Sequence, residues 1–174
     1  MITVKQHGSH VDHLMRATQF HHVQLSSMAD VKANMLLTMS SVVLTLCLPQ
    51  VLKNPHLWPL YILVCFCLLT ICLATYAVMP KLPPANLPPP DMNDPKFNLL
   101  FFGDFSRLSQ QQFEEAMEGL LNDHSRTYAA QVREIYLLGM FLAKKKYRYL
   151  RFAYLSFIVG LFASFAAFVI LEFC

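Results

Sequence analysis

The stretch MADVKANMLLTMSSVVLTL, residues 28–46, begins with charged side chains and ends as an apolar segment. It leads into a run without Asp, Glu, Lys, Arg or His at residues 35–52, and similar runs cover residues 57–79 and 152–171. Each run has about 18 to 23 residues, and a helix of about 20 residues crosses the ~30 Å hydrocarbon core of a bilayer. We therefore expect three membrane-spanning helices, at residues 33–52, 57–79 and 152–172.

The composition indicates a membrane protein with one domain. The chain has 174 residues, of which 55% are hydrophobic and 14% are charged, whereas soluble domains carry about 25% charged residues. Four of the five cysteines lie in the apolar runs, where we expect them to be buried as small hydrophobic residues. Their spacing favours neither disulfides nor a zinc site.

The distribution of Lys and Arg predicts the orientation of the chain in the membrane. Residues 1–32 carry three of these side chains, the loop at 53–56 carries one, and residues 80–151 carry ten. Cytoplasmic loops carry an excess of Lys and Arg. We therefore expect the N-terminus and residues 80–151 in the cytoplasm, and the 53–56 loop and Cys174 on the opposite side.

The cytoplasmic parts are predicted to be helical, apart from a proline-rich strap with an apolar segment at residues 80–108. An N-terminal helix at residues 1–32 is expected to continue into the first span. Ser109 and Gln112 form a capping-box pattern that opens the helical region at residues 109–151. A second helix in this region starts near Asp123 or Ser125 and should run unbroken into the third span. The fold class is thus an all-α membrane protein with a helical cytoplasmic stalk.

Two charged residues at the entrance of the first span, Asp30 and Lys32, need partners outside their own helix. Residues two apart on a helix point about 200° from each other, so this pair cannot form an ion pair within the helix. Arg148 and Arg151 should lie at the same depth and are the expected partners of Asp30. The alternative is that Asp30 and Lys32 are headgroup-level anchors.

A series of polar residues in the first span, Asn34, Thr38, Ser41 and Thr45, is spaced four, three and four residues apart. This spacing places the four side chains on one face of a helix. Polar groups in hydrocarbon need partners or water, so this face should contact other helices or line a pore. Helix packing and pore lining both remain open. Three spans are too few to enclose a conduit, so a pore requires a homo-oligomer, for which we take a tetramer with the first span innermost.

The third span and the segment before it suggest two further contacts. Ser156, Gly160 and Ser164 form a small-residue seam that suits close helix packing. The basic segment at residues 144–151, repeated around a symmetry axis, would form a positive ring at the inner mouth and favour anions. The alternative is an ordinary anchor that binds anionic lipid.

The sequence shows no pattern typical of an enzyme, because it contains no phosphate-binding Gly-rich loop, nucleophile elbow or paired catalytic carboxylates. His7, His10 and His13 recur every three residues, but a solvated helix is favoured over a metal site, and no cofactor is expected. A nucleotide could still bind by stacking on aromatic rings while arginines hold its phosphate. The candidates are Phe101, Phe102, Phe105, Arg107, Arg126 and Arg133. The alternative is that these aromatic rings belong to the core.

Short motifs give the chain a family resemblance. These are Ala29-Asp30-x-Lys32-Ala33 at the start of a span, Asn98-Leu99-Leu100-Phe101-Phe102-Gly103, and Lys146-Tyr147 before the last span. Over residues 10–170, the chain resembles the transmembrane effectors of bacterial Pycsar antiphage systems. A similar layout occurs in the channel subunit of the Hailong system, in which a DNA oligomer holds the channel shut.

The resemblance implies an effector in the bacterial inner membrane. Together with the distribution of Lys and Arg, this predicts a cytoplasmic N-terminus and a periplasmic C-terminus. The resemblance also implies control by a nucleotide or DNA-oligomer signal from a partner nucleotidyltransferase or cyclase; Pycsar members respond to cyclic pyrimidine mononucleotides. The leading hypothesis is therefore a ligand-regulated ion channel for antiphage defence. The alternative is a non-conducting membrane adaptor that recruits a partner protein through its cytoplasmic helices.

Overall fold

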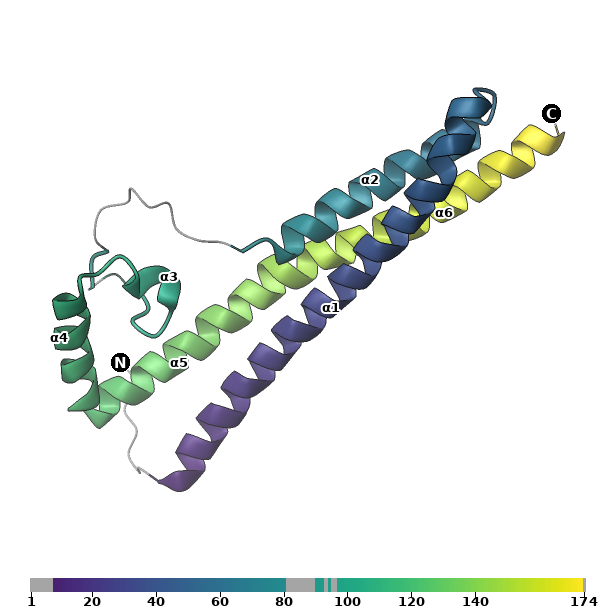
Figure 1. Ribbon diagram of the computed structural model, residues 1–174. Helices are drawn as coiled ribbons and strands as arrows, with labels where there is room; N and C mark the ends of the chain where they lie inside the picture. The colour runs from purple at the N-terminus through teal and green to yellow at the C-terminus, as the bar shows by residue number, and fades with distance from the viewer. Residues whose placement is uncertain (1–7, 81–89, 93, 95–96, 174) are drawn as a thin grey trace. The chain divides into compact units, whose positions relative to one another are not determined.

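The computed structural model describes residues 8–80, 90–92, 94 and 97–173, and its secondary structure is helical (Figure 1). The elements are α1 (Ser9–Lys53), α2 (Trp58–Val78), α3 (Phe102–Phe105), α4 (Gln110–Leu121), α5 (His124–Phe141), the π-helical turn η1 (Leu142–Lys146) and α6 (Tyr147–Phe173). No strand occurs among the described residues, which confirms the all-α fold. Most of the predicted proline-rich strap, residues 81–89, 93 and 95–96, lies outside them.

Among the described residues, three helices are long and apolar enough to span a membrane, namely Ser9–Lys53, Trp58–Val78 and His124–Phe173. The prediction of three spans is thereby confirmed, whereas the depth of each span in a bilayer stays a prediction. The N-terminal helix continues into the first span without a break, as expected. The helix that ends in the third span contains one irregularity that the sequence did not reveal, the π-helical turn at Leu142–Lys146, where the backbone N–H of Tyr147 bonds to the carbonyl of Leu142.

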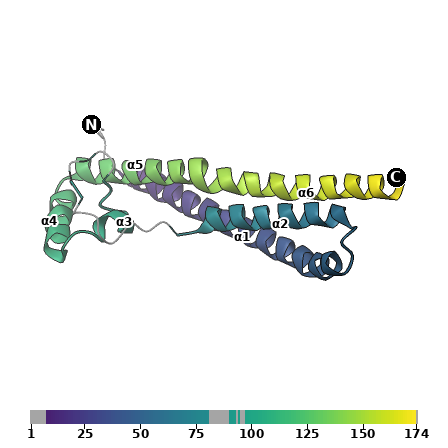
Figure 2. The ribbon, with the colours of Figure 1, turned by 90° about the horizontal axis from the view of Figure 1, so that it is seen from above.

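The chain divides into two compact units. Unit 1 comprises residues 1–23 and 80–140, and unit 2 comprises residues 24–79 and 141–174, which include the apolar spans. In unit 2, α2 and α6 lie side by side (Figures 1 and 2).

The small-residue seam of α6 is the surface that packs against α2. Ser156, Gly160 and Ser164 are buried, and a Cβ atom added at Gly160 would lie only 2.4 Å from the Cβ of Phe66. The Ser164 hydroxyl donates a hydrogen bond of 3.0 Å to the carbonyl of Pro59. Small side chains thus let the backbones of α2 and α6 approach closely. The seam therefore packs two helices of the same chain.

One face of α1 packs on this pair of helices and completes the core of unit 2. The face contains Ala29, Ala33 and Leu36, each at most 2% exposed. These side chains form a single cluster with residues of α2 and α6, including Cys67, Ala74, Leu150, Ala153 and Phe157. Buried positions on α1 and on α6 recur with alternating spacings of three and four residues, which is the repeat of left-handed helix packing.

Several polar contacts define the local structure of unit 1. Ser109 and Gln112 form the predicted capping box at the start of α4. Asn98 is 3% exposed; its amide donates to Glu134 of α5, and its side-chain oxygen accepts from the backbone N–H of Leu100 at 3.1 Å. The carboxylate of Asp104 accepts from the backbone N–H of Asn98 at 3.0 Å. These bonds fix the turn before α3 on the surface of α5.

Candidate functional site

The four polar residues of the first span form an exposed row on α1. Asn34, Thr38, Ser41 and Thr45, which we call the polar stripe, are all exposed in the single chain. At about 100° per residue, the stripe occupies roughly 60° of the helix surface and lies on the side away from the face that packs on α2 and α6. The sequence predicted this common face, and the structure adds that neither α2 nor α6 covers it.

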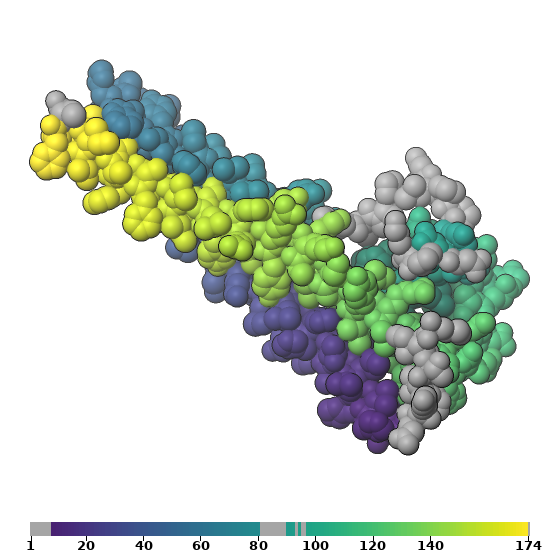
Figure 3. All heavy atoms as spheres, turned by 180° about the vertical axis from the view of Figure 1, so that it is seen from behind, coloured from purple at the N-terminus to yellow at the C-terminus, as the bar shows by residue number. Residues whose placement is uncertain are grey.

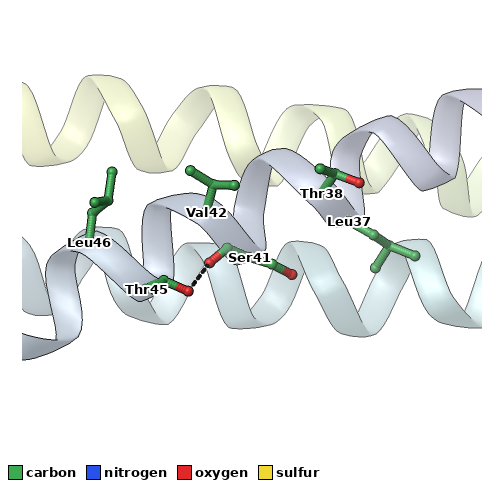
Figure 4. Close-up of a pocket in the computed structure, with 6 residues that line it drawn as sticks. All are labelled: Leu37, Thr38, Ser41, Val42, Thr45 and Leu46. Atoms are coloured by element: carbon green, nitrogen blue, oxygen red, sulfur yellow. Dashed lines mark hydrogen bonds between the residues drawn. The ribbon is translucent and has the colours of Figure 1, made fainter.

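A shallow hollow runs along the polar stripe (Figure 4). Its lining consists of residues of α1 only: Leu37, Thr38, Ser41, Val42, Thr45 and Leu46. The Thr38 hydroxyl donates to the carbonyl of Asn34, and the Thr45 hydroxyl donates to the carbonyl of Ser41, both at 2.9 Å. The hydroxyl hydrogens are therefore satisfied inside the helix, while their oxygens remain available to accept hydrogen bonds from water.

The other two stripe residues have no such internal partner. Within the described part of the chain, neither the Asn34 amide nor the Ser41 hydroxyl forms a side-chain hydrogen bond. A buried polar group without a partner costs about 1–3 kcal/mol. These two side chains therefore demand water or a neighbouring polar group more strongly than the two threonines do.

A polar contact joins α1 to the π-helical turn next to the base of the stripe. The Lys146 side chain is 8% exposed, and its Nζ lies 2.7 Å from Oδ1 of Asp30. The same ammonium group donates to the Ser26 hydroxyl at 2.8 Å, and the adjacent Tyr147 hydroxyl donates to the carbonyl of Leu25 at 3.0 Å. Lys146 is thus a buried cation with both an anionic and a neutral partner.

The prediction that Asp30 pairs with Arg148 or Arg151 is therefore wrong, because its partner in the structure is Lys146. The predicted residues Arg148 and Arg151 are exposed, and the guanidinium of Arg148 lies 5.9 Å from the centre of the Phe152 ring. They lie on the side of α6 away from its packing face, whereas Lys146 is on the packing face, so only Lys146 reaches α1. Lys32 is exposed.

The position of Lys146 on the packing face of α6 could have been predicted from the sequence. Lys146 precedes the buried residues of α6 at the same spacing of four and three residues, being followed by Leu150, Ala153, Phe157 and Gly160. Ser26 likewise precedes Ala29 and Ala33 on α1. Extending each packing seam by one turn would have placed a lysine opposite a serine.

The three arginines of the candidate nucleotide site have local partners in unit 1. Arg107 lies 3.6 Å from Asp104, Arg126 lies 3.5 Å from Asp123, and Arg133 donates to the carbonyl of Phe97 at 3.1 Å. The Arg126 side chain remains 63% exposed. Arg133 and Asn98 both act on the turn before α3, which gives them a structural role.

The three candidate aromatic residues lie in two ring pairs, Phe105 with Phe113 and Phe101 with Phe102. The Phe105 ring packs on Phe113 with centres 5.0 Å apart, so this residue belongs to the local core. The Phe101 and Phe102 rings have centres 4.9 Å apart and are 39% and 54% exposed. Only this second pair offers ring surface to a ligand.

Among the described residues, no group of three His, Cys, Asp or Glu side chains is placed to hold a metal ion. His10 and His13 of the histidine repeat are exposed on α1, and His7 lies outside the described residues.

In a comparison with known families, a family model described as the Pycsar effector protein domain matches residues 13–171. The matched region includes all three apolar runs, at residues 35–52, 57–79 and 152–171. Neither a curated protein nor a solved structure matches the chain. The similarity to the Hailong channel subunit stays a prediction.

Proposed function

Because the chain belongs to the Pycsar effector family, whose members are membrane effectors of antiphage defence, we propose that it forms an ion-conducting homo-oligomeric pore. Pycsar effectors respond to cyclic nucleotide signals from a partner cyclase. In this proposal, the pore lies in the bacterial inner membrane with its N-terminus in the cytoplasm, and a nucleotide signal controls its opening.

The observation that carries the proposal is the exposed polar stripe of α1. In a single chain in a bilayer, the Asn34 amide and the Ser41 hydroxyl would face acyl chains, which neither donate nor accept hydrogen bonds. The other face of α1 is already occupied by α2 and α6. The stripe therefore favours contact with another protein chain or with water, and a ring of copies with α1 innermost supplies both.

The outer surfaces of α2 and α6 support this arrangement. Beyond Arg151, their large exposed side chains are mostly apolar, including Leu68 and Leu69 of α2 and Phe162 and Phe165 of α6, which are 49–71% exposed. Such residues suit contact with lipid, whereas the stripe does not. Turning α1 toward the axis of the oligomer therefore puts apolar surface outward and hydroxyl groups inward.

For the nucleotide signal, we propose unit 1 as the receiver. The exposed Phe101 and Phe102 rings can stack with a base. Arg126 is the candidate for the phosphate because its side chain is largely exposed and its pair with Asp123 is a surface pair that contributes little. Replacing Phe102 or Arg126 by Ala should weaken ligand binding by the full-length protein.

The decisive experiment is conductance of the purified full chain in planar bilayers, with and without cyclic pyrimidine mononucleotides and DNA oligomers. The double variant Thr38→Leu/Ser41→Leu should lower single-channel conductance. The matched control is Thr75→Leu, which removes an exposed hydroxyl from α2 and should leave conductance unchanged. Reversal potentials in a KCl gradient would show whether the pore favours anions.

If wild-type protein passes no ions under any ligand condition, the pore proposal is wrong. If the Thr38→Leu/Ser41→Leu variant is as toxic to cells as the wild type, the membrane adaptor is favoured instead. That adaptor should lose its effect when α4 or α5 is altered.

A further inference from the structure

Four exposed cations gather at the junction of η1 and α6. They are Lys144, Lys145, Arg148 and Arg151, and none of them forms an ion pair with another described residue. The fifth cation of the segment, Lys146, is already paired with Asp30. The cluster therefore presents four positive charges without a counter-charge from the residues that the structure describes.

The cluster continues into an exposed apolar row on the same side of α6. Arg148 and Arg151 are followed at helical spacing by Leu155, Val159 and Phe162, which are 46%, 49% and 71% exposed. The opposite side of α6 carries its buried residues. In the space-filling view, one side of α6 is left uncovered by α1 and α2 along its length (Figure 3).

Two aromatic residues at this end of α6 suit a position at the edge of the hydrocarbon. The Tyr149 ring meets the Tyr76 ring of α2 edge to face, with centres 4.5 Å apart. Tyr side chains gather where hydrocarbon meets the headgroups. This predicts that the four cations lie at headgroup level, with the apolar row beginning directly beside them within the hydrocarbon.

We propose that Lys144, Lys145, Arg148 and Arg151 bind the anionic headgroup of a glycerophospholipid, such as phosphatidylglycerol, whose acyl chain lies along the row Leu155, Val159 and Phe162. A phosphodiester accepts hydrogen bonds from several Arg and Lys donors at once. The contact between the Arg148 guanidinium and the Phe152 ring holds that side chain along the helix, which orders it for the headgroup.

The adjoining apolar row favours a lipid over a free nucleotide. A soluble nucleotide would fill the charged part of the surface and leave three large hydrophobic side chains without a partner, whereas a phospholipid satisfies both parts. The same row argues against a place at an aqueous inner mouth, because Leu, Val and Phe would then line water. The proposal does not depend on ion conduction.

The test measures lipid binding by the full chain in zwitterionic detergent, using native mass spectrometry during titration with phosphatidylglycerol or phosphatidylcholine. Wild type should bind phosphatidylglycerol preferentially. Each surface cation contributes about 1 kcal/mol to binding of an anionic membrane, which corresponds to about fivefold in affinity. Arg148→Gln/Arg151→Gln should therefore weaken phosphatidylglycerol binding roughly 25-fold and leave phosphatidylcholine binding unchanged.

Two controls accompany this variant. Arg148→Lys/Arg151→Lys keeps both charges and should retain most of the preference. Lys53→Gln removes an exposed cation at the far end of α1 and should have no effect.

Three outcomes would overturn the proposal: equal binding of the two lipids by wild type, unchanged binding by the glutamine variant, or displacement of phosphatidylglycerol by a cyclic nucleotide. A fourth would be a glutamine variant that shifts the reversal potential without changing lipid binding, because the cluster would then face the pore. Failure of the protein to conduct ions would leave the lipid measurement intact, so the two proposals fail separately.

Discussion

Asp30 connects two features of unit 2, the polar stripe of α1 and the contact with Lys146. Helical spacing places it one turn before Asn34 at the base of the polar stripe, and its carboxylate binds the buried ammonium of Lys146. The pair is asymmetric, because the Asp30 side chain is 44% exposed while that of Lys146 is 8% exposed. Loss of the carboxylate therefore matters more than loss of the lysine, since it leaves a charge buried with only Ser26 as its partner.

This asymmetry predicts the order of stability in a double-mutant cycle. Asp30→Asn should lower the free energy of unfolding by about 1–3 kcal/mol, and adding Lys146→Met should restore most of this loss. Thermal unfolding of the protein in detergent measures both values. Lys32→Gln is the control, because Lys32 is exposed on the same helix and its loss should have little effect. Additive effects of the two substitutions would mean that the contact contributes nothing.

A second residue-scale prediction concerns the phenol of Tyr128 in unit 1. Its hydroxyl donates to Oδ1 of Asp12 at 2.6 Å, and this hydrogen bond raises the pKa of Tyr128 above its usual value near 10, with burial and the negative charge of Asp12 adding to the shift. A raised pKa in the folded state means that folding favours the protonated phenol. The resulting contribution to stability is complete below pH 10 and is lost as the pH rises through the raised pKa.

Melting temperatures measured between pH 8 and pH 11.5 should therefore fall more steeply for wild type than for Tyr128→Phe. The phenylalanine variant cannot ionise at this position and keeps the ring. Parallel curves for the two proteins would show that the hydrogen bond does not form in solution.

At the scale of the helix, the contact between α2 and α6 depends on the absence of a side chain at Gly160. Gly160→Ala should destabilise the protein by about 1–3 kcal/mol, because the added Cβ would lie 2.4 Å from the Cβ of Phe66 and the helices would have to separate. Thermal unfolding in detergent again provides the measurement.

Gly119 in α4 supplies the matched control. A Cβ there meets no atom within 4 Å, so Gly119→Ala should stabilise the helix by about 0.5–1 kcal/mol through the higher helix propensity of alanine. The same substitution is thus expected to have opposite signs in the two helices. Equal effects at both positions would contradict the close packing of α2 on α6.

At the scale of the whole molecule, the proposed pore requires copies of the chain to meet along α1. A single cysteine at Ser41, in a background with the five native cysteines replaced by alanine, should form disulfide-linked dimers in membranes under mild oxidation. A cysteine at Phe162, on the exposed side of α6, should not. Dimers from the Phe162 position alone would place α6 at the interface and would contradict an inner ring of α1 helices.

The sequence by itself determined the class of the molecule and its local structure. Hydropathy predicted three spans because a bilayer imposes a minimum length of apolar helix, and Ser109 with Gln112 predicted a helix start because the capping bonds are local. Spacing alone also placed Asn34, Thr38, Ser41 and Thr45 on one face. Each of these properties depends on residues within a few turns of one another.

Only the tertiary structure decided which way each face points. Whether Lys146, Arg148 or Arg151 meets Asp30 depends on the rotation of α6 about its own axis, which is set by the packing of Gly160 and its neighbours on α2 and by the π-helical turn. The same rotation leaves Arg148 and Arg151 on the side with the exposed apolar row. The rotation of α1, which buries Ala29, Ala33 and Leu36, leaves the polar stripe uncovered. Rotation is a property of contacts between distant segments, so a pattern within one helix predicts which residues share a face but not what that face meets.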